Sequence, residues 1–181
     1  MDLNEFLEDK YGRRFVTLDV NGSGLLEPED YEEAATRMCA LSGTRPDLGS
    51  GRRLVEAYRA AHRSLARAAG APYGIGRKEF TAVMCDRLAG RPEAFDHGMA
   101  AVGELVFEVC DIDRDGFLDE RDYCRFLAGY GVPRDAALEA VRRLAPTGRL
   151  RLGREEFLAH SRDFYCGTDP AAPGTWMFGV F

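Results

Sequence analysis

Apolar side chains recur every three or four residues along most of the chain, and this spacing predicts amphipathic helices. Glycine or proline interrupts the pattern at intervals and marks the breaks between helices. Eight helices are predicted in this way, near residues 3–18, 28–41, 52–69, 77–88, 93–110, 120–129, 134–144 and 153–163. Runs of β-branched residues, which favour strands, are almost absent. The pattern therefore predicts an all-α fold.

A short motif repeats four times and divides the chain into four helix–loop–helix units. In each instance an aliphatic residue is followed four positions later by Asp or Glu, and then directly by an aromatic residue. The instances are Leu26–Asp30–Tyr31, Ile75–Glu79–Phe80, Leu118–Asp122–Tyr123 and Leu152–Glu156–Phe157. Their unequal spacing argues against a regular solenoid. Chance amphipathic patterning is the alternative, and the loops that precede two of the instances argue against it.

Two loops, residues 19–30 and 111–122, match the EF-hand calcium loop over most of its length. Alternate oxygen-bearing side chains at positions 1, 3 and 5 converge on a cation only if the chain turns sharply at position 6. Gly24 and Gly116 stand at that position and supply the positive φ that the turn requires. We expect four such units in two pairs, which together form one compact molecule.

The candidate metal ligands follow from the positions in each loop. The first loop offers the side chains of Asp19, Asn21, Ser23, Glu27 and Asp30 and the backbone carbonyl of Leu25. The second loop offers the side chains of Asp111, Asp113, Asp115, Asp119 and Asp122 and the backbone carbonyl of Phe117. A pair of merely polar turns is the alternative. Two such loops, each between matching helices, favour metal binding.

The formal net charge of −6 is smaller in magnitude than the number of these acidic ligands, so the acidity of the chain is local to the two loops. Such a balance does not suggest a nucleic-acid-binding protein, which needs a basic surface. Five carboxylates in the second loop repel one another strongly without a counter-ion. A bound cation would therefore order that unit.

Both loops depart from the calcium pattern at position 12, where Asp30 and Asp122 replace the usual glutamate. Aspartate is one methylene shorter, so it reaches an ion less easily with both oxygens. A single contact gives a smaller shell that suits Mg²⁺ better than a seven-coordinate shell does. Ser23 is a neutral, weaker ligand in the first loop. We expect mixed Ca²⁺/Mg²⁺ sites, with 111–122 the tighter.

The other two units have lost their ligands. The loop over 68–79 has Ala, Gly and Pro at positions 1, 3 and 5, and the loop over 145–156 carries arginines where carboxylates belong. Each is expected to support a metal-binding partner through a short β-bridge, with Leu26 opposite Ile75 and Leu118 opposite Leu152. The two pairs are predicted over 1–90 and 91–181, the second with an apolar tail over 165–181. The segment 89–95 is too short to be a flexible linker.

With four units, these spacings and the ending DFYCGTDPAAPGTWMFGVF, the chain resembles the sarcoplasmic calcium-binding protein family, especially its prokaryotic calerythrin-like members. The resemblance implies a compact calcium or calcium/magnesium binder with at least one degenerate unit. Relatives often keep the fourth loop functional, and this chain departs from them there. Two bound ions are therefore expected rather than three or more.

The tail separates three hypotheses about function. Its apolar residues Trp176, Met177, Phe178, Val180 and Phe181 are expected to fold back and fill the groove between the two halves. A filled groove favours an intracellular buffer or transporter over a sensor, which needs that groove for a target. The alternative is a calcium sensor whose tail a target protein displaces. Photoproteins and luciferin-binding proteins share the fold, so a carrier of an apolar ligand is a third possibility, disfavoured if the tail fills the cavity.

Other features exclude further classes of protein. The histidines His62, His97 and His160 are far apart in sequence, and no nucleophile or phosphate-loop motif appears, so we do not expect an enzyme. Five cysteines at irregular spacing predict free thiols. No signal peptide, lipidation motif or membrane anchor is expected, nor a protein target. We expect a cytoplasmic monomer whose partners are calcium and magnesium ions.

Overall fold

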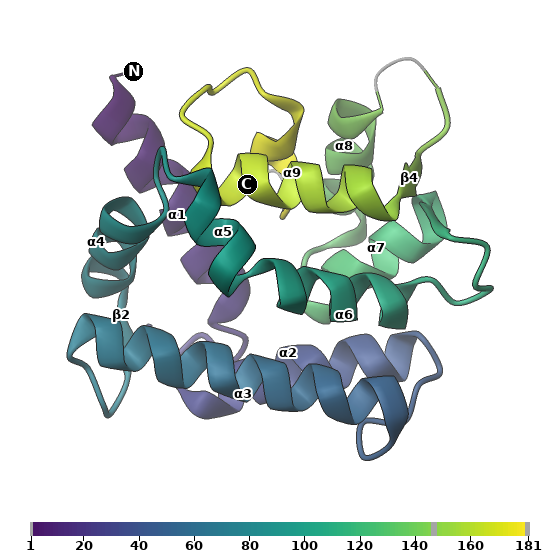
Figure 1. Cartoon of the computed structure of the whole chain (residues 1–181), viewed down its shortest axis with the longest axis horizontal. Coiled ribbons are helices and arrows are strands. Elements are labelled where there is room, and N and C mark those ends of the chain that lie inside the picture. Colours follow the sequence, from purple (N-terminus) through teal and green to yellow (C-terminus); the bar gives the residue numbers. More distant parts are fainter. Residues whose placement is uncertain (1, 146–147, 180–181) are drawn as a thin grey trace.

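A computed structural model of the chain describes residues 2–145 and 148–179. Pro146 and Thr147 of the fourth loop, and Val180 and Phe181 of the tail, lie outside the described residues. The described part is all-α, as predicted, with four short strands (Figure 1). Its helices are α1 Leu3–Leu18, α2 Pro28–Leu41, α3 Gly49–Ala69, α4 Arg77–Arg87, α5 Pro92–Gly98, α6 Ala100–Cys110, α7 Glu120–Gly129, α8 Arg134–Leu144, α9 Arg154–Cys166 and the 3₁₀ helix η1 Pro173–Trp176.

The prediction of one helix over 93–110 is wrong, because the chain forms α5 and α6 there. Glycine is a weak helix former, and α5 ends at Gly98. Helix α6 then leaves in a different direction (Figure 1). The bend lets Phe95, on the short α5, enter the core, where its side chain is fully buried.

Two small antiparallel sheets join the loops in pairs. Strand β1 (Leu25–Leu26) pairs with β2 (Ile75–Gly76), and β3 (Phe117–Asp119) pairs with β4 (Arg151–Gly153). Leu26 lies opposite Ile75, and Leu118 lies opposite Leu152, so the predicted bridges are confirmed. All four side chains are buried, which fixes the register of each pair.

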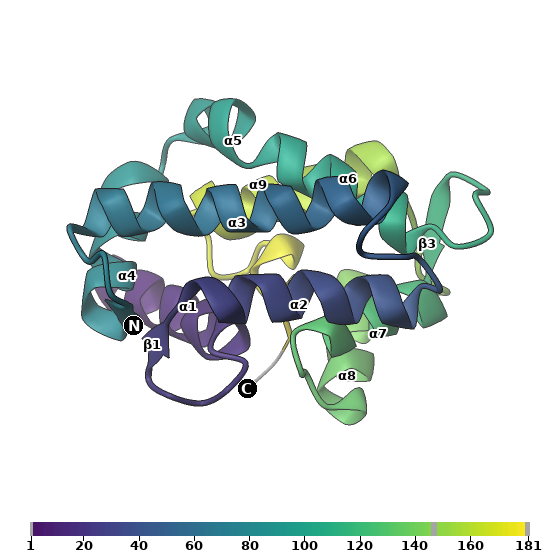
Figure 2. The ribbon, with the colours of Figure 1, turned by 90° about the horizontal axis from the view of Figure 1, so that it is seen from below.

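The two sheets belong to a single hydrophobic core. Helices α2 and α3 run side by side, and they pack against α7 and α6 respectively (Figure 2). Phe107 and Phe126, far apart in sequence, both lie with their ring edges against Phe157. The hydroxyls of Tyr58 on α3 and of Tyr130, directly after α7, share a buried hydrogen bond. The hydrogen bond and the stacked rings of Tyr58 and Tyr130 therefore join the early and late parts of the chain.

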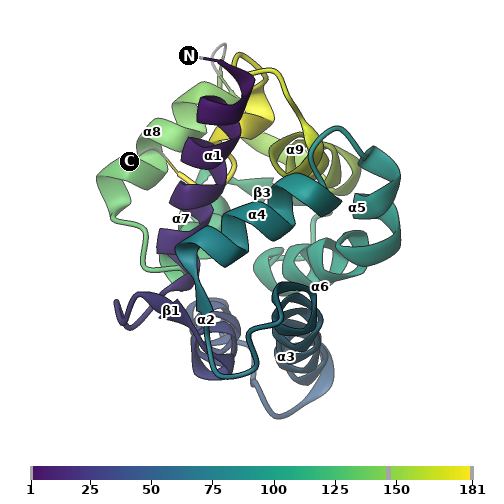
Figure 3. The same ribbon diagram turned by 90° about the vertical axis from the view of Figure 1, so that its left-hand side faces the viewer.

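Helix α1 crosses α4 and lies beside the end of α9 (Figure 3). Three of its buried polar side chains bind the late part of the chain. Lys10 Nζ donates a hydrogen bond to the carbonyl oxygen of Gly167 at 2.6 Å. The hydroxyl of Tyr11 donates to the carbonyl oxygen of Tyr165 at 2.7 Å, and Arg14 Nε donates to the Tyr165 hydroxyl at 3.0 Å. Helix α1 is thereby joined to the C-terminal end of α9.

The burial of Lys10 makes stability depend on pH. Burial lowers the pKa of Lys10 from 10.5 to about 8, so the cost of its buried charge is fully present below pH 8 and disappears toward pH 10.5. Lys10 alone should raise the free energy of unfolding by up to about 3 kcal/mol across that window. The thiols and the buried tyrosines oppose this rise, because burial raises the pKa of Cys110 from 9.0 to about 12 and that of Tyr165 from 10.0 to about 12.

Urea unfolding of the wild type and of Lys10→Met between pH 7 and pH 10 isolates the contribution of Lys10. The free energy of unfolding of the wild type should rise relative to that of Lys10→Met as the pH increases, whereas Lys78→Met should follow the wild type, because Lys78 is exposed and is the only other lysine of the chain. A difference between the wild type and Lys10→Met that does not change with pH would contradict the prediction.

The tail covers one side of the molecule but does not fill its interior. Met177 and Phe178 are buried, and the Tyr123 hydroxyl donates a hydrogen bond to the Met177 carbonyl oxygen at 2.6 Å. A cavity of about 600 Å³ remains between the helices, and Phe178 forms part of its wall. The expectation of a filled groove is therefore wrong for the described residues. Helix η1 packs on α8 and α9, and of the described residues that follow α9, Phe178 alone lines the cavity.

Candidate metal centres

The loop over 111–122 is shaped by two residues with positive φ. Helix α6 ends where the Asp111 N–H caps the Phe107 carbonyl. The backbone then turns at Arg114, with φ of 60°, and at Gly116, with φ of 83°. Glycine adopts this region without steric cost, whereas arginine does not. Only the turn at position 6 was predicted, and the strained position 4 was not.

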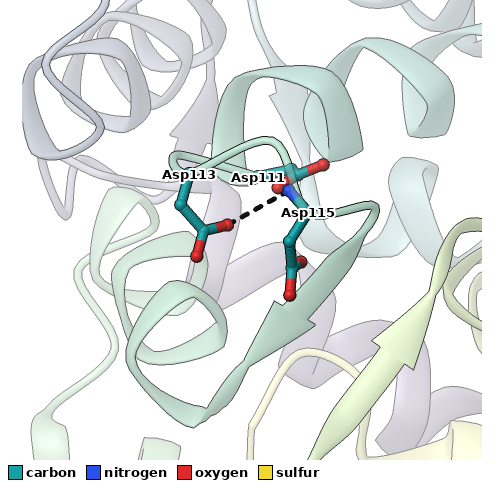
Figure 4. Close-up of side chains that lie close together, drawn as sticks. All are labelled: Asp111, Asp113 and Asp115. Carbon is teal, nitrogen blue, oxygen red and sulfur yellow. Dashed lines mark hydrogen bonds between the residues drawn. The ribbon is translucent and has the colours of Figure 1, made fainter.

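This turn brings three carboxylates together. Oxygen atoms of Asp111, Asp113 and Asp115 all lie within 4.8 Å of one another (Figure 4). The Asp115 N–H donates to Asp113 Oδ1 at 3.2 Å, and the Gly116 N–H donates to Asp111 Oδ2 at 3.1 Å. The other oxygen of Asp111, Oδ1, is buried and has no hydrogen-bond partner among the described residues. A buried acceptor without a donor, in a group of hard oxygens, fits a hard divalent cation.

The last two acidic side chains of the loop form the start of α7. The Asp122 N–H donates to Asp119 Oδ1 at 2.9 Å, and the Asp119 N–H donates to Asp122 Oδ2 at 3.4 Å. This reciprocal capping holds position 12 at the helix N-terminus. Burial and the neighbouring Asp119 raise the pKa of the Asp122 carboxyl. Asp122 does not belong to the group of three carboxylates. Its Oδ1 instead forms an ion pair with Arg125 Nη1 at 3.3 Å.

The loop over 19–30 closes on itself through its first and last acidic residues. Asp19 accepts hydrogen bonds from the backbone N–H groups of Ser23 at 3.0 Å and Gly24 at 2.9 Å. Asp30 is almost completely buried, and its Oδ1 accepts from the Asn21 N–H at 3.3 Å. Position 12 is thereby joined to position 3 across the loop.

The remaining candidates of this loop lie on its exposed side or at the start of α2. Asn21 Oδ1 accepts from the Ser23 N–H at 2.7 Å, and the Ser23 hydroxyl donates to the Leu25 carbonyl at 3.1 Å. The Glu27 N–H donates to Asp30 Oδ2 at 2.9 Å, which begins α2. Within the described residues, no group of three carboxylates comes together here as in the second loop.

The loops 68–79 and 145–156, which lack the acidic ligand pattern, have other side chains in its place. In the second unit, α3 ends at Ala69, and Gly70 follows with φ of 62°. The described part of the fourth unit places Arg151 against the loop 111–122, with Nη2 3.6 Å from Asp115 Oδ2. The guanidinium also lies 3.8 Å above the Phe117 ring. This cross-loop contact was not predicted, because it depends on the β3–β4 pairing.

Arg151 should weaken cation binding at 111–122, because its positive charge competes for Asp115. Arg151→Gln is expected to tighten divalent-cation binding there by a few-fold, which corresponds to about 1 kcal/mol or less because both side chains are exposed. Calorimetric titration measures the change. Arg149→Gln, at an exposed position of the same loop, removes the same charge and should have a smaller effect. Equal effects of the two variants would show that only the net charge matters.

Known proteins are similar in sequence to this chain over most of its length. No family model matches the chain. The chain is 25% identical over 162 residues to calerythrin of Saccharopolyspora erythraea, with 88% of this chain and 92% of calerythrin covered. It is 27% identical over 173 residues to a luciferin-binding protein of Renilla reniformis, with 94% and 91% covered.

Solved structures show the same arrangement of helices. A calcium-binding protein of Streptomyces coelicolor superimposes with a TM-score of 0.73 and 27% identity, over 88% of this chain and 97% of that one. A sarcoplasmic calcium-binding protein from amphioxus has the same fold, with a TM-score of 0.71 and 15% identity over 98% of both chains. In the part that the structure describes, none of the helices has the length and apolar character of a membrane span. The chain is therefore similar in sequence to calerythrin and to the Streptomyces calcium-binding protein, and it has the fold of the amphioxus sarcoplasmic calcium-binding protein.

Proposed function

We propose that the chain reversibly binds two divalent cations, Ca²⁺ or Mg²⁺, one in each of the loops 19–30 and 111–122. The observation that carries this proposal is the buried, unpartnered Oδ1 of Asp111 beside the carboxylates of Asp113 and Asp115. A cation would satisfy that oxygen and screen the repulsion among the three groups. Calerythrin and the Streptomyces protein, which is named as a calcium-binding protein, support the same function.

The proposed ligands are those of the loop pattern. Asp19, Asn21, Ser23, Glu27 and Asp30 with the Leu25 carbonyl would hold one ion. Asp111, Asp113, Asp115, Asp119 and Asp122 with the Phe117 carbonyl would hold the other. All are oxygen donors, which suits Ca²⁺ and Mg²⁺ rather than softer metals. The short aspartate at position 12 favours a near-octahedral shell, so Mg²⁺ should compete at both sites.

The proposed role is an ion buffer or transporter of the sarcoplasmic calcium-binding type, working as a cytoplasmic monomer and not as an enzyme. Its two EF-hand pairs would span 1–90 and 91–181. The buried tail residues Met177 and Phe178 support a buffer over a sensor, because a target helix would have to displace them from the core. A sensor with a displaceable tail is the alternative.

Calorimetric titration of calcium, with and without millimolar magnesium, tests this proposal. We expect two calcium ions per chain and a weaker apparent calcium affinity when magnesium is present. Four bound ions would refute the assignment of 68–79 and 145–156 as loops that bind no ion. A calcium affinity that magnesium does not change would refute the shared sites.

The central cavity favours a second candidate function, a carrier of an apolar small molecule. Its volume of about 600 Å³ lies in the range of sites for drug-sized ligands. The Renilla relative is named as a luciferin-binding protein, which supports ligand binding in this fold. Metal binding and ligand binding use different residues, so the chain could perform both.

A further inference from the structure

The cavity between the helices is apolar along most of its wall. Its buried lining comes from elements spread over the whole chain, including Leu18, Met84, Phe95, Val106 and Phe157. Its exposed lining residues come chiefly from α3, α4 and α5 and their connections, so the cavity meets solvent on that side. An apolar cavity of this size that reaches the surface is a typical small-molecule site.

The charge of the lining has one sign. Among the described residues that line the cavity there is no Asp or Glu, whereas Arg14, Arg87, Arg91 and His97 are present. Arg87, Arg91 and His97 are exposed and lie near the opening. This is unexpected in a chain with a net charge of −6. The cavity therefore has a basic opening and one buried basic group, Arg14, in an acidic protein.

Arg14 is a buried charged residue of the cavity wall without a charged partner among the described residues, which is evidence for a ligand. Its side chain is buried, and its described hydrogen bonds go to two neutral hydroxyls, those of Tyr165 at 3.0 Å and Thr17 at 3.1 Å. The guanidinium carbon lies 3.8 Å from the ring centre of Phe178 and 4.2 Å from that of Tyr130. No carboxylate of the described residues forms an ion pair with it. Buried charges are normally paired, because an isolated one is costly.

We propose that the cavity binds an apolar monoanion, with the anionic group at Arg14 and the hydrophobic skeleton along the apolar wall. This inference rests on the second candidate function and names the chemical class of its ligand. Tyr58 and Tyr130 line the same cavity, and because their hydroxyls share one hydrogen bond, one O–H of the pair is left to donate to the anion. Charge-assisted hydrogen bonds from a guanidinium are stronger than neutral ones, so the cavity should bind an anionic ligand more tightly than a neutral ligand with the same skeleton.

A matched pair of fluorescent probes tests the charge preference in the full chain. 8-Anilinonaphthalene-1-sulfonate is an aromatic monoanion, and N-phenyl-1-naphthylamine has the same skeleton without the sulfonate. We expect one molecule of the anionic probe per chain, bound about tenfold or more tightly than the neutral probe. Dodecanoate should displace the anionic probe at lower concentration than dodecanol does. This comparison of acid and alcohol needs no variant.

Three variants locate the binding site. Arg14→Met should weaken the anionic probe by about tenfold or more and change the neutral probe less than twofold. Arg87→Met, at the exposed edge, should change either probe only slightly. Ala61→Phe, which adds a ring to the cavity wall, should weaken both probes. Circular dichroism and calcium titration establish that each variant is folded.

The outcomes separate this inference from the functions on which it rests. If neither probe binds, or if Ala61→Phe affects neither, the cavity is not a ligand site and the carrier function fails with it. If both probes bind equally, or Arg14→Met weakens both alike, the carrier stands and the anion inference is overturned. Should Arg14→Met fail to fold, equal displacement by dodecanoate and dodecanol would overturn it. Calcium stoichiometry reports on the metal loops independently.

Discussion

Replacement of Asp111 by asparagine should weaken divalent-cation binding in the loop 111–122 by about 100-fold or more, since even supporting residues around metal ligands affect affinity by 10–100-fold. One oxygen of Asp111 accepts the Gly116 N–H, and the other is buried without a donor. An amide has only one oxygen. Its NH₂ group must face either the Gly116 N–H or the proposed cation, and both arrangements are repulsive.

Calorimetry should then show one ion of undiminished affinity, held by the loop 19–30. Asp86→Asn is the matched control, because Asp86 is exposed on α4 and the same charge is lost far from both loops. Asp19→Asn should give the reverse result and remove the other ion. Retention of two ions of wild-type affinity in Asp111→Asn would show that the group of three carboxylates is not a metal centre.

Replacement of Phe178 by alanine should lower the free energy of unfolding by about 3–5 kcal/mol, the usual range for a buried aromatic residue. The Phe178 ring lies 4.7 Å from that of Phe164, centre to centre, and 5.8 Å from that of Tyr130. It also covers the buried guanidinium of Arg14. Since Phe178 already borders a cavity, its removal enlarges an existing void, which the surroundings cannot close.

Urea unfolding measures this loss, and Trp176→Ala is the control within the same tail. Trp176 is larger but only half-buried, so its truncation should cost less than that of Phe178. Calcium stoichiometry should stay at two in both variants, because neither residue contacts a metal loop. A smaller loss for Phe178 than for Trp176 would contradict the assignment of Phe178 as the anchor of the tail.

The turns of the loops 19–30 and 111–122 and their β-pairing could be predicted from sequence because their determinants are local. Gly24 and Gly116 stand at fixed distances from the acidic ligands, and the β-bridges follow from the same register. Arg114 was missed, because a non-glycine residue with positive φ has no sequence signature and is tolerated only where the rest of the loop imposes it.

The cavity and the buried charges around it could not be predicted in this way. The volume that remains beside Phe178 depends on how side chains from most of the helices meet, and apolar periodicity does not contain that information. The same holds for Lys10. Its position on α1 looks like an ordinary polar site until the end of α9 covers it and Gly167 accepts its hydrogen bond.

The chain contains a single tryptophan, and its place in the tail makes it a natural optical probe. Trp176 lies with its ring 3.9 Å from the guanidinium carbon of Arg143 on α8 and 5.2 Å from that of Arg13 on α1. Its fluorescence therefore reports on the position of the tail against α1 and α8. An emission spectrum that stays constant during calcium titration would indicate a tail that remains docked, and a red shift would indicate its release into water.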